Sequence, residues 1–329
     1  MNFAPAYARP VPRRQRGVAI ITALLLTTLA VTIVASLFWM QQVQIRSMEN
    51  QRLQLQTKWI LRGGVDFSRM LLREEGLQRP AYTSLLSIWN TPLEETKLDD
   101  YVEKERLETE KSDATLQGRV VDATSRYNLA NLTQGSQIDP LQVAVFRRLL
   151  GHLKINPALA QKTAQLVVEG VGPAQVPIGQ PQPAARTKVP LALTRLEDLL
   201  AVPGYTVDDI NKLREFTVVL PDAPTTINVN TAPAEVIAAL VNNFSLQQAQ
   251  ALVARRKQAD YRSTADFTAQ LFGVPSSDWP AQNMFDVKSE WFLVRSRVKL
   301  DRAQLDAESL VNRQLTSPNL TVVKWVRQN

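Results

Sequence analysis

The chain has 329 residues, 45% hydrophobic and 21% charged, a composition that suits a membrane segment and one or two folded domains. It contains no cysteine, which excludes disulfides, thiolate catalysis and zinc held by cysteine. The formal net charge is +7, but residues 1–17 carry +4 of it, leaving 34 Lys and Arg against 31 Asp and Glu. This balance does not indicate a nucleic-acid-binding surface.

The N-terminus joins a basic leader to a long apolar run through one glycine. The basic residues are Arg13, Arg14 and Arg16, and the glycine is Gly17. Residues 18–40 contain no charge and would span about 34 Å as a helix, enough to cross a hydrocarbon core of roughly 30 Å. Because positive flanks resist translocation, we expect the leader in the cytoplasm and residues 41–329 across the membrane. A cleaved signal peptide fits poorly, since its apolar region is only about 7–15 residues long.

Residues 41–75 are predicted to continue the same helix outside the membrane. We expect an apolar stripe on this helix to contact a partner, because exposed apolar area calls for one. Its residues are Val43, Met48, Leu55 and Trp59. Two glycines, Gly63 and Gly64, indicate either a bend or close packing against a neighbour, and both interpretations stay open.

The segments that follow show mainly strand patterns. Residues 92–113 mix charges and are interpreted as a solvated helix or loop, whereas 115–132 are predicted to form a strand pair. Residues 290–300 and 319–328 alternate apolar with polar side chains, which is typical of half-buried antiparallel strands. A sheet that begins and resumes in this way implies that residues 135–280 are an insertion.

The insertion is predicted to be helical. Its expected helices are 138–153, 157–169, 195–202, 206–215, 231–241, 245–257 and 263–271. Residues 171–190 hold five prolines and no acidic residue, so they are predicted to form a loop. Thr231 is expected to cap the helix that follows it, with Pro233 in the first turn. Residues 126–133 and 226–233 have similar sequences. Asparagines in both segments could hydrogen-bond to their own backbone and so direct the chain into the helix that follows.

Residues 227–267 resemble helix-hairpin-helix DNA-binding modules through the INVNTA opening and the trailing YRSTADF. In such modules a glycine-rich turn lets backbone amides contact a phosphate. Here the turn at 242–245 has no glycine, and the turn at Gly204 is followed by Asp208 and Asp209, which would repel phosphate. We therefore expect a scaffold. A membrane-anchored DNA-binding protein for uptake is the alternative, and an ordinary signal-anchored periplasmic protein is a third possibility.

Motifs of catalysis are missing from the sequence. His152 is the only histidine, and neither GxxxxGK[ST] nor GxGxxG occurs. Since no serine has a base in view and no cysteine exists, the sequence predicts neither a catalytic nor a metal site, and we do not expect an enzyme.

The leader, the glycine and the apolar run resemble the prepilin peptidase site of type IV pilins and type II secretion pseudopilins. The resemblance implies cleavage between Gly17 and Val18 on the cytoplasmic side, followed by methylation of Val18. Most family members carry glutamate at the fifth mature position, where this chain has Thr22. An intramembrane carboxylate is costly without a partner, and the resemblance implies that this partner is the amino terminus of the subunit above. A subunit with nothing above it would not need the glutamate.

The missing glutamate and the insertion resemble the minor pseudopilin K family of type II secretion. The resemblance implies an α+β pseudopilin fold. In it, a long N-terminal transmembrane helix packs on an antiparallel sheet that carries an inserted all-α, SAM-like or helix-hairpin-helix-like subdomain. The domains expected are a leader (1–17), a transmembrane helix (18–40), a helix extension with the first strands (41–134), the insertion (135–280) and the last strands (281–329).

The same resemblance implies a location and partners. The protein would sit in the Gram-negative inner membrane with a periplasmic C-terminal domain, at the tip of the pseudopilus. There it would nucleate assembly with the minor pseudopilins I and J, after contact with the prepilin peptidase and the inner-membrane assembly platform. Related proteins often bind calcium at an Asp-rich loop after the second insertion helix, but 171–190 is free of acids. We expect no calcium there, no other cofactor and no nucleic-acid partner.

Overall fold

The computed structural model describes residues 16–101, 113–171, 192–221, 224–314 and 320–328. They belong to two compact units, Met1–Gln56 and Thr57–Asn329. The α-helices are α1 (Arg16–Gln78), α2 (Pro140–His152), α3 (Leu159–Val171), α4 (Val207–Leu213), α5 (Ala234–Leu240), α6 (Leu246–Arg256) and α7 (Thr264–Thr268). The strands are β1 (Leu93–Lys97), β2 (Thr115–Asp122), β3 (Tyr127–Asn128), β4 (Thr133–Gln134), β5 (Gln137–Ile138), β6 (Thr217–Val218), β7 (Ile227–Asn228), β8 (Phe285–Asp286), β9 (Trp291–Leu300), β10 (Ala303–Arg313) and β11 (Thr321–Gln328).

The first unit contains the apolar part of α1. Among the described residues this is the one helix long and apolar enough to cross a membrane, judged by length and composition alone. The hydroxyl groups of Thr27, Thr28 and Thr32 donate to carbonyls three or four residues earlier in the helix. Polar side chains that bond back to their own helix leave no unsatisfied group, which suits a helix in hydrocarbon.

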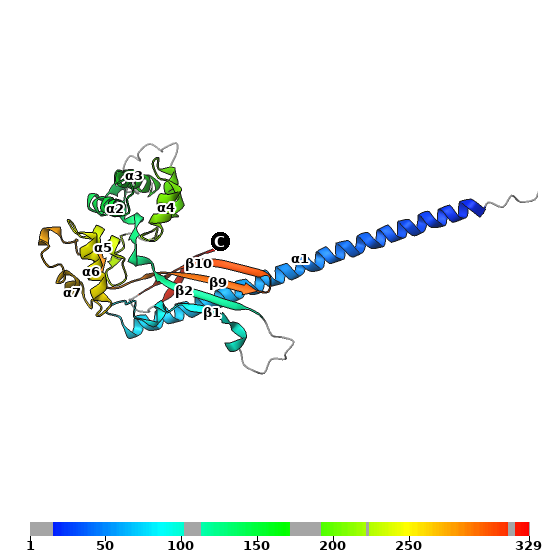
Figure 1. Cartoon of the computed structure of the whole chain (residues 1–329), viewed down its shortest axis with the longest axis horizontal. Helices are drawn as coiled ribbons and strands as arrows, with labels where there is room; N and C mark the ends of the chain where they lie inside the picture. The colour runs from blue at the N-terminus through cyan, green and yellow to red at the C-terminus, as the bar shows by residue number, and fades with distance from the viewer. Residues whose placement is uncertain (1–15, 102–112, 172–191, 222–223, 315–319, 329) are drawn as a thin grey trace, which may run out of the picture. The chain divides into compact units, whose positions relative to one another are not determined.

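The second unit is built on an antiparallel sheet with the strand order β1-β2-β9-β10-β11 (Figure 1). The last turns of α1 pack against one face of it, where Val65 and Leu72 meet Phe292 and Val311. Trp89 closes this layer, with its ring edge-on to Phe292 at 5.3 Å between centroids. Each such side chain stabilises the fold by about 1.5–3 kcal/mol when fully buried, so α1 is firmly held. The predicted α+β fold is confirmed.

The strand predictions are partly correct. Strands β9 and β11 fall where alternation predicted them, at 290–300 and 319–328. The expected strand pair at 115–132 is wrong in its second half, because only β2 is a long strand there. Its neighbours are β1 and β9. Residues 123–132 instead form two short 3₁₀ turns around β3. Two strands of the five-stranded sheet were missed altogether: β1, inside the charge-mixed segment, and β10, which lies between β9 and β11.

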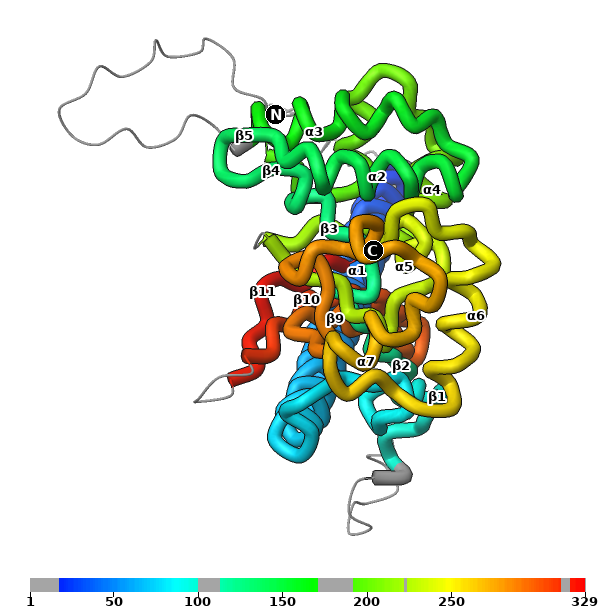
Figure 2. Tube along the Cα trace, turned by 90° about the vertical axis from the view of Figure 1, so that its left-hand side faces the viewer, coloured from blue at the N-terminus to red at the C-terminus, as the bar shows by residue number. Residues whose placement is uncertain are grey.

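The helical part of this unit has its own core, whose buried members run from Tyr127 to Val287. Helix α2 packs against both α3 and α5, and α5 against α6 (Figure 2). Pro140 opens α2 and the side chain of Asp139 caps it by accepting from two backbone amides, so sequence and structure agree on this helix start. All seven predicted helices of the insertion correspond to helical turns, although the segment predicted at 195–202 is the 3₁₀ helix Leu196–Ala201.

The glycine pair in α1 is explained by packing. Helix α1 runs without interruption through both positions. A Cβ added at Gly64 would lie 3.2 Å from the Leu116 side chain of β2, whereas one at Gly63 would meet nothing within 4 Å. Gly64 therefore permits the helix to approach the sheet closely, which is the second of the two interpretations left open by the sequence.

Candidate functional site

The residues expected at the processing site lie at the start of α1. The backbone of Gly17 is already helical, and the Val18 side chain is 62% exposed. Thr22 donates its hydroxyl to the carbonyls of Val18 and Ala19, both at 3.0 Å, so its polar group is satisfied inside its own helix. The leader residues Arg13 and Arg14 lie outside the described residues, and for Arg16 only the backbone is described.

The predicted contact stripe is corrected by the helix geometry. Val43, Met48 and Leu55 are all more than half exposed on α1. At 100° per residue, Met48 and Leu55 lie about 20° apart around the axis, but Val43 lies about 140° from Met48. Val43 therefore does not share a stripe with the other two. The spacing of positions 43 and 48 in the sequence already contains this result, because in a regular helix the face depends on spacing alone.

Trp59, the fourth stripe residue, belongs to the second unit. Its ring is 67% exposed, and the guanidinium of Arg62 lies 5.7 Å from the ring centroid. The indole thus offers a large apolar surface with a cation at its border, a combination that is frequent at protein interfaces.

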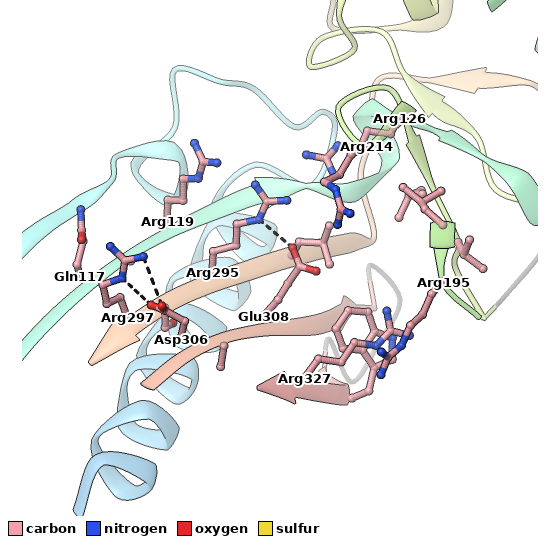
Figure 3. A pocket seen from close by; sticks show the side chains of 18 of the residues that line it. Gln117, Arg119, Arg126, Arg195, Arg214, Arg295, Arg297, Asp306, Glu308 and Arg327 are labelled. Carbon is pink, nitrogen blue, oxygen red and sulfur yellow. Dashed lines mark hydrogen bonds and ion pairs between the residues drawn. The ribbon is translucent and has the colours of Figure 1, made fainter. Parts of the chain in front are cut away.

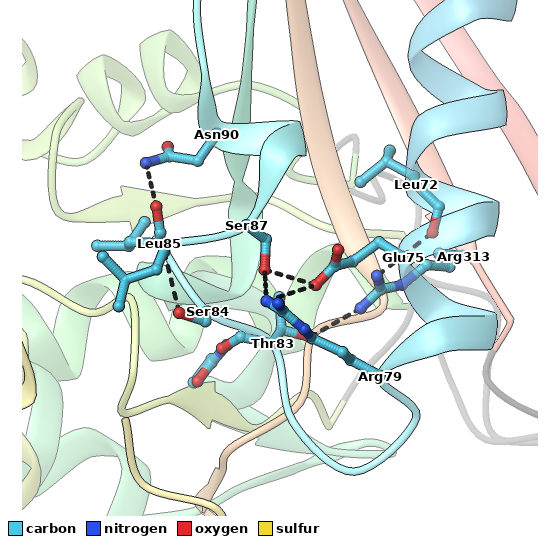
Figure 4. Close-up of polar contacts among 11 residues, drawn as sticks. Leu72, Glu75, Arg79, Thr83, Ser84, Leu85, Ser87, Asn90 and Arg313 are labelled. Atoms are coloured by element: carbon cyan, nitrogen blue, oxygen red, sulfur yellow. Dashed lines mark hydrogen bonds and ion pairs between the residues drawn. The ribbon is translucent and has the colours of Figure 1, made fainter. Parts of the chain in front are cut away.

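A buried polar cluster anchors the C-terminal end of α1 (Figure 4). Arg313, at the end of β10, is 2% exposed and donates to the Thr83 hydroxyl at 2.7 Å and to the Ser289 carbonyl at 2.8 Å. Its guanidinium also lies over the Phe292 ring, 4.8 Å from the centroid. Burial lowers the pKa of Arg313, and the nearby carboxylates of Asp122 and Glu75 oppose this shift. The cluster joins the helix, the sheet and the loop after α1 into one body.

A second buried cluster surrounds Asp122 at the end of β2. Its carboxylate accepts hydrogen bonds from the backbone and hydroxyl of Thr124, at 2.8 and 2.7 Å, and from the side chains of Asn228, Thr231 and Ser289. Thr231 is thus committed to this carboxylate and does not cap α5, whose N-cap is Pro233. The predicted asparagine turns are confirmed: Asn128 and Asn228 each accept from the backbone amide two residues on.

The helix-hairpin-helix-like residues face the protein interior. Asn230 and the backbone of Tyr261 exchange two hydrogen bonds, at 2.8 and 2.9 Å, which tie INVNTA to YRSTADF. Arg256, the last residue of α6, is 6% exposed and donates to the Val229 carbonyl at 2.7 Å. Burial lowers the pKa of Arg256 to about 10. These groups hold the hairpin together and are not presented to a phosphate backbone.

The helices that follow the turns of this region, α4, α6 and α7, are capped by side chains of the chain itself, whereas α5 begins at Pro233 without a side-chain cap. Thr206, Ser245 and Ser263 each accept from the third residue of their helix, and the side chain of that third residue bonds back. Because the amides at a helix start are the groups that bind phosphate, capping removes the docking points on which a DNA-binding hairpin depends.

No group of three or more His, Asp or Glu side chains that could hold a metal occurs in the described part of the chain. The segment 171–190, to which the calcium expectation referred, lies almost wholly outside the described residues. His152 ends α2.

A basic cleft that the sequence did not predict lies on the sheet face opposite α1 (Figure 3). Its volume is about 620 Å³. Seven arginines line it: Arg119, Arg126, Arg195, Arg214, Arg295, Arg297 and Arg327. Four carboxylates do so too: Glu94, Glu197, Asp306 and Glu308. The alternation of basic residues at 295, 297 and 299 was the one signal available, but the arginines of other elements join them only through the fold.

The chain is similar to type II secretion proteins over most of its length. A family model described as type II secretion system (T2SS), protein K matches residues 227–288, and another with the same description matches residues 125–222. The type II secretion system protein K of Pseudomonas aeruginosa is 30% identical over 318 residues, covering 91% of this chain and 89% of that protein. The protein K of Pectobacterium carotovorum is 25% identical, covering 91% and 93%.

A solved structure has the same fold. It is the crystal structure of the GspK–GspI–GspJ complex from the type 2 secretion system of enterotoxigenic Escherichia coli. One chain of it matches with a TM-score of 0.64 and 20% sequence identity, covering 86% of this chain and 99% of that chain.

Proposed function

The chain belongs to the type II secretion system protein K family, and we propose that it acts as a minor pseudopilin at the tip of the pseudopilus. There it nucleates assembly with other minor pseudopilins for protein export across the outer membrane. The observation that supports the tip position is Thr22. Its hydroxyl is hydrogen-bonded within its own helix, whereas a carboxylate at this position would need a partner on a subunit above it. The proposed role is structural and involves no catalysis and no cofactor, calcium included.

The size of the helical part supports the same position. The two family matches cover 125–222 and 227–288, and the helices there pack around a core of their own. A shaft subunit must stack closely on its neighbours, and this additional mass would collide with them. A subunit at one end of the filament has free space for it.

Processing and topology follow from the start of α1. Prepilin peptidase cleaves between Gly17 and Val18 on the cytoplasmic side, the new amino terminus is methylated, and the assembly platform of the inner membrane receives the subunit. The basic leader keeps residues 1–17 in the cytoplasm, and the part after the apolar segment lies in the periplasm. The expected division at 17, 40, 134 and 280 stays a prediction.

The partners proposed are the minor pseudopilins I and J. The support is the solved relative, which its authors describe as a GspK–GspI–GspJ complex. On this chain we assign the contact to the exposed apolar residues of α1, among them Met48 and Leu55. DNA uptake is not favoured, because the helix starts of the hairpins are capped and Arg256 is buried.

Site-directed photocrosslinking tests the partner contact. The photoreactive residue p-benzoylphenylalanine replaces Met48, Leu55 or Arg46 in the full chain, expressed with its secretion system. Arg46 is exposed and lies about 160–180° around α1 from the other two positions, so it is the matched control. We expect products with I and J from Met48 and Leu55 and few from Arg46. Equal yields at all three positions would rule out this face as the contact.

A further inference from the structure

The basic cleft contains like charges that are placed directly against one another. Arg119 of β2 is the register partner of Arg295 of β9, so two guanidinium groups stand opposite each other on the same sheet face. Like charges in this position destabilise a sheet. Burial lowers the pKa of Arg126, the neighbouring Arg295 and Arg119 lower it further, and the carboxylates of Glu308 and Asp122 oppose the shift. Three arginines from two strands and the turn after β2 therefore repel each other at one end of the cleft.

Few of these charges are compensated within the protein. Arg214 pairs with Glu197, Arg295 with Glu308 and Arg297 with Asp306, at 2.6–2.8 Å. These ion pairs use three of the four carboxylates of the cleft.

The other four arginines have no ion pair with any described residue: Arg119, Arg126, Arg195 and Arg327. Arg327 donates to the Thr194 carbonyl at 3.0 Å, and its guanidinium lies 3.9 Å from the Trp325 ring centroid. Burial and then the Arg195 cation lower the pKa of Arg327, whereas the carboxylates of Glu308, Glu197 and Asp198 oppose this shift.

We propose that this cleft is a docking site for an acidic segment of a partner protein, whose carboxylates would occupy the arginines left without ion pairs. Seven arginines against four carboxylates leave a surplus of positive charge inside a cleft of about 620 Å³. Arginine binds carboxylates through two parallel hydrogen bonds, which gives both strength and orientation. All the residues that line the cleft belong to the second unit, whereas Met48 and Leu55 belong to the first, so the two proposed contacts use different residues.

The cleft favours a peptide over a nucleic acid. Its four carboxylates are interspersed among the arginines and would repel a continuous phosphate backbone. Trp325, the one aromatic side chain of the lining, is covered by the guanidinium of Arg327, so no ring is free to stack a base. In contrast to a phosphate backbone, a peptide that mixes acidic and other residues can place its carboxylates at the unpaired arginines and avoid the carboxylates of the cleft.

Binding of a fluorescein-labelled decaglutamate peptide to the full chain in detergent tests the proposal. Fluorescence anisotropy is measured at about 50 mM and about 500 mM salt, because screening should weaken the contact. We expect the double variant Arg119→Gln/Arg126→Gln to bind about tenfold more weakly or worse, since it loses two charge-assisted contacts. Arg119→Lys/Arg126→Lys keeps both charges and should recover part of the affinity.

The matched control is Arg147→Gln/Arg262→Gln, which removes the same charge from two exposed positions outside the cleft, one in α2 and one in the bend before α7. It should bind the peptide like the unaltered chain. Equal affinity of the control and of Arg119→Gln/Arg126→Gln would overturn the proposal, as would equal binding of decalysine. A single-stranded oligonucleotide of the same charge that competes as well as unlabelled decaglutamate would overturn the assignment to a protein segment.

Discussion

Asp122 and Asn228, which are 106 positions apart in the sequence, are joined by a hydrogen bond of 3.2 Å in the protein interior. Asp122 ends the sheet strand β2, and Asn228 opens the second half of the helical part. Because Thr231 and Ser289 bond to the same carboxylate, one side chain connects the end of β2 to the segment before α5 and to the segment before β9. Movement of either part would break several buried hydrogen bonds at once.

Replacement of this carboxylate should therefore be costly. Asp122→Ala leaves the amide and hydroxyl of Thr124 and the hydroxyl of Ser289 without their acceptor, and each unsatisfied buried group costs about 1–3 kcal/mol. Asn228 and Thr231 also lose a hydrogen bond but keep other acceptors. We expect a loss of at least about 3 kcal/mol in the free energy of unfolding, measured by urea titration of the full chain in detergent. The exposed Asp208→Ala is the control and should change little; a similar midpoint for both variants would contradict the prediction.

The glycine pair of α1 provides a matched test of helix packing. Gly63→Ala should stabilise the helix by about 0.5–1 kcal/mol, because alanine restricts the unfolded chain and its Cβ meets no neighbour. Gly64→Ala should gain less or destabilise, since its Cβ would press on Leu116. Urea midpoints of the two variants decide this, and equal gains would show that Leu116 moves aside without cost.

Processing should depend on Gly17. A bulky side chain blocks the close approach of a protease to the backbone, so Gly17→Val should retain the leader and abolish secretion. Intact-mass measurement of the membrane-extracted protein shows directly whether the leader is still attached. Gly63→Ala, far from the cleavage site, serves as the control and should be processed normally. A Gly17→Val protein that still loses 17 residues would disprove the assignment.

Restoring the family glutamate should bring no benefit at the tip. Thr22→Glu places a carboxylate in the apolar segment with no amine above it to pair with, so secretion should stay equal or fall. Thr22→Ser keeps a hydroxyl that can bond the helix backbone and should behave as the unaltered chain. Activity of a secreted enzyme in the culture supernatant gives the comparison. Immunogold label along the whole filament shaft, in place of one end, would contradict the tip position.

Alkaline pH should weaken the helical part through Tyr205. Its hydroxyl lies 2.9 Å from that of Thr163, and burial raises its pKa from 10 to about 12. The folded protein thus holds this proton where the unfolded chain has lost it. Stability from this group is complete below pH 10 and is lost as the pH rises from about 10 to about 12.

Melting temperatures measured at a series of pH values from about 9 to about 11.5 test the Tyr205 prediction. The decline should be shallower in Tyr205→Phe, which has no phenol to titrate, than in the unaltered chain. Tyr82→Phe is a control at a partly exposed tyrosine. An identical decline in Tyr205→Phe and Tyr82→Phe would contradict the prediction.

Local sequence patterns were sufficient to predict the elements whose apolar residues follow the period of a helix or of a strand. The apolar run at 18–40 predicted the membrane-length part of α1, and alternation at 290–300 predicted β9. The cap of α2, Asp139 with Pro140, also satisfies backbone groups within a few positions, although the residue pair was not singled out as a cap from the sequence. Periods and caps both depend on residues that are close together in the chain, so they can be recognised from a single sequence.

The tertiary structure alone decided the elements and sites that depend on distant partners. Strand β10 alternates apolar with polar side chains only over 303–308, and its full length depends on the hydrogen bonds that β9 and β11 supply on both sides. Thr231 looks like a helix cap, but the buried carboxylate of Asp122 binds its hydroxyl. The basic cleft likewise needs strands, a turn and helical segments to meet. Sequence by itself determined what neighbours along the chain dictate, namely the anchor, most helices and the three strands β2, β9 and β11. Long-range pairing and burial decided the rest, because those energies depend on which residues the fold brings together.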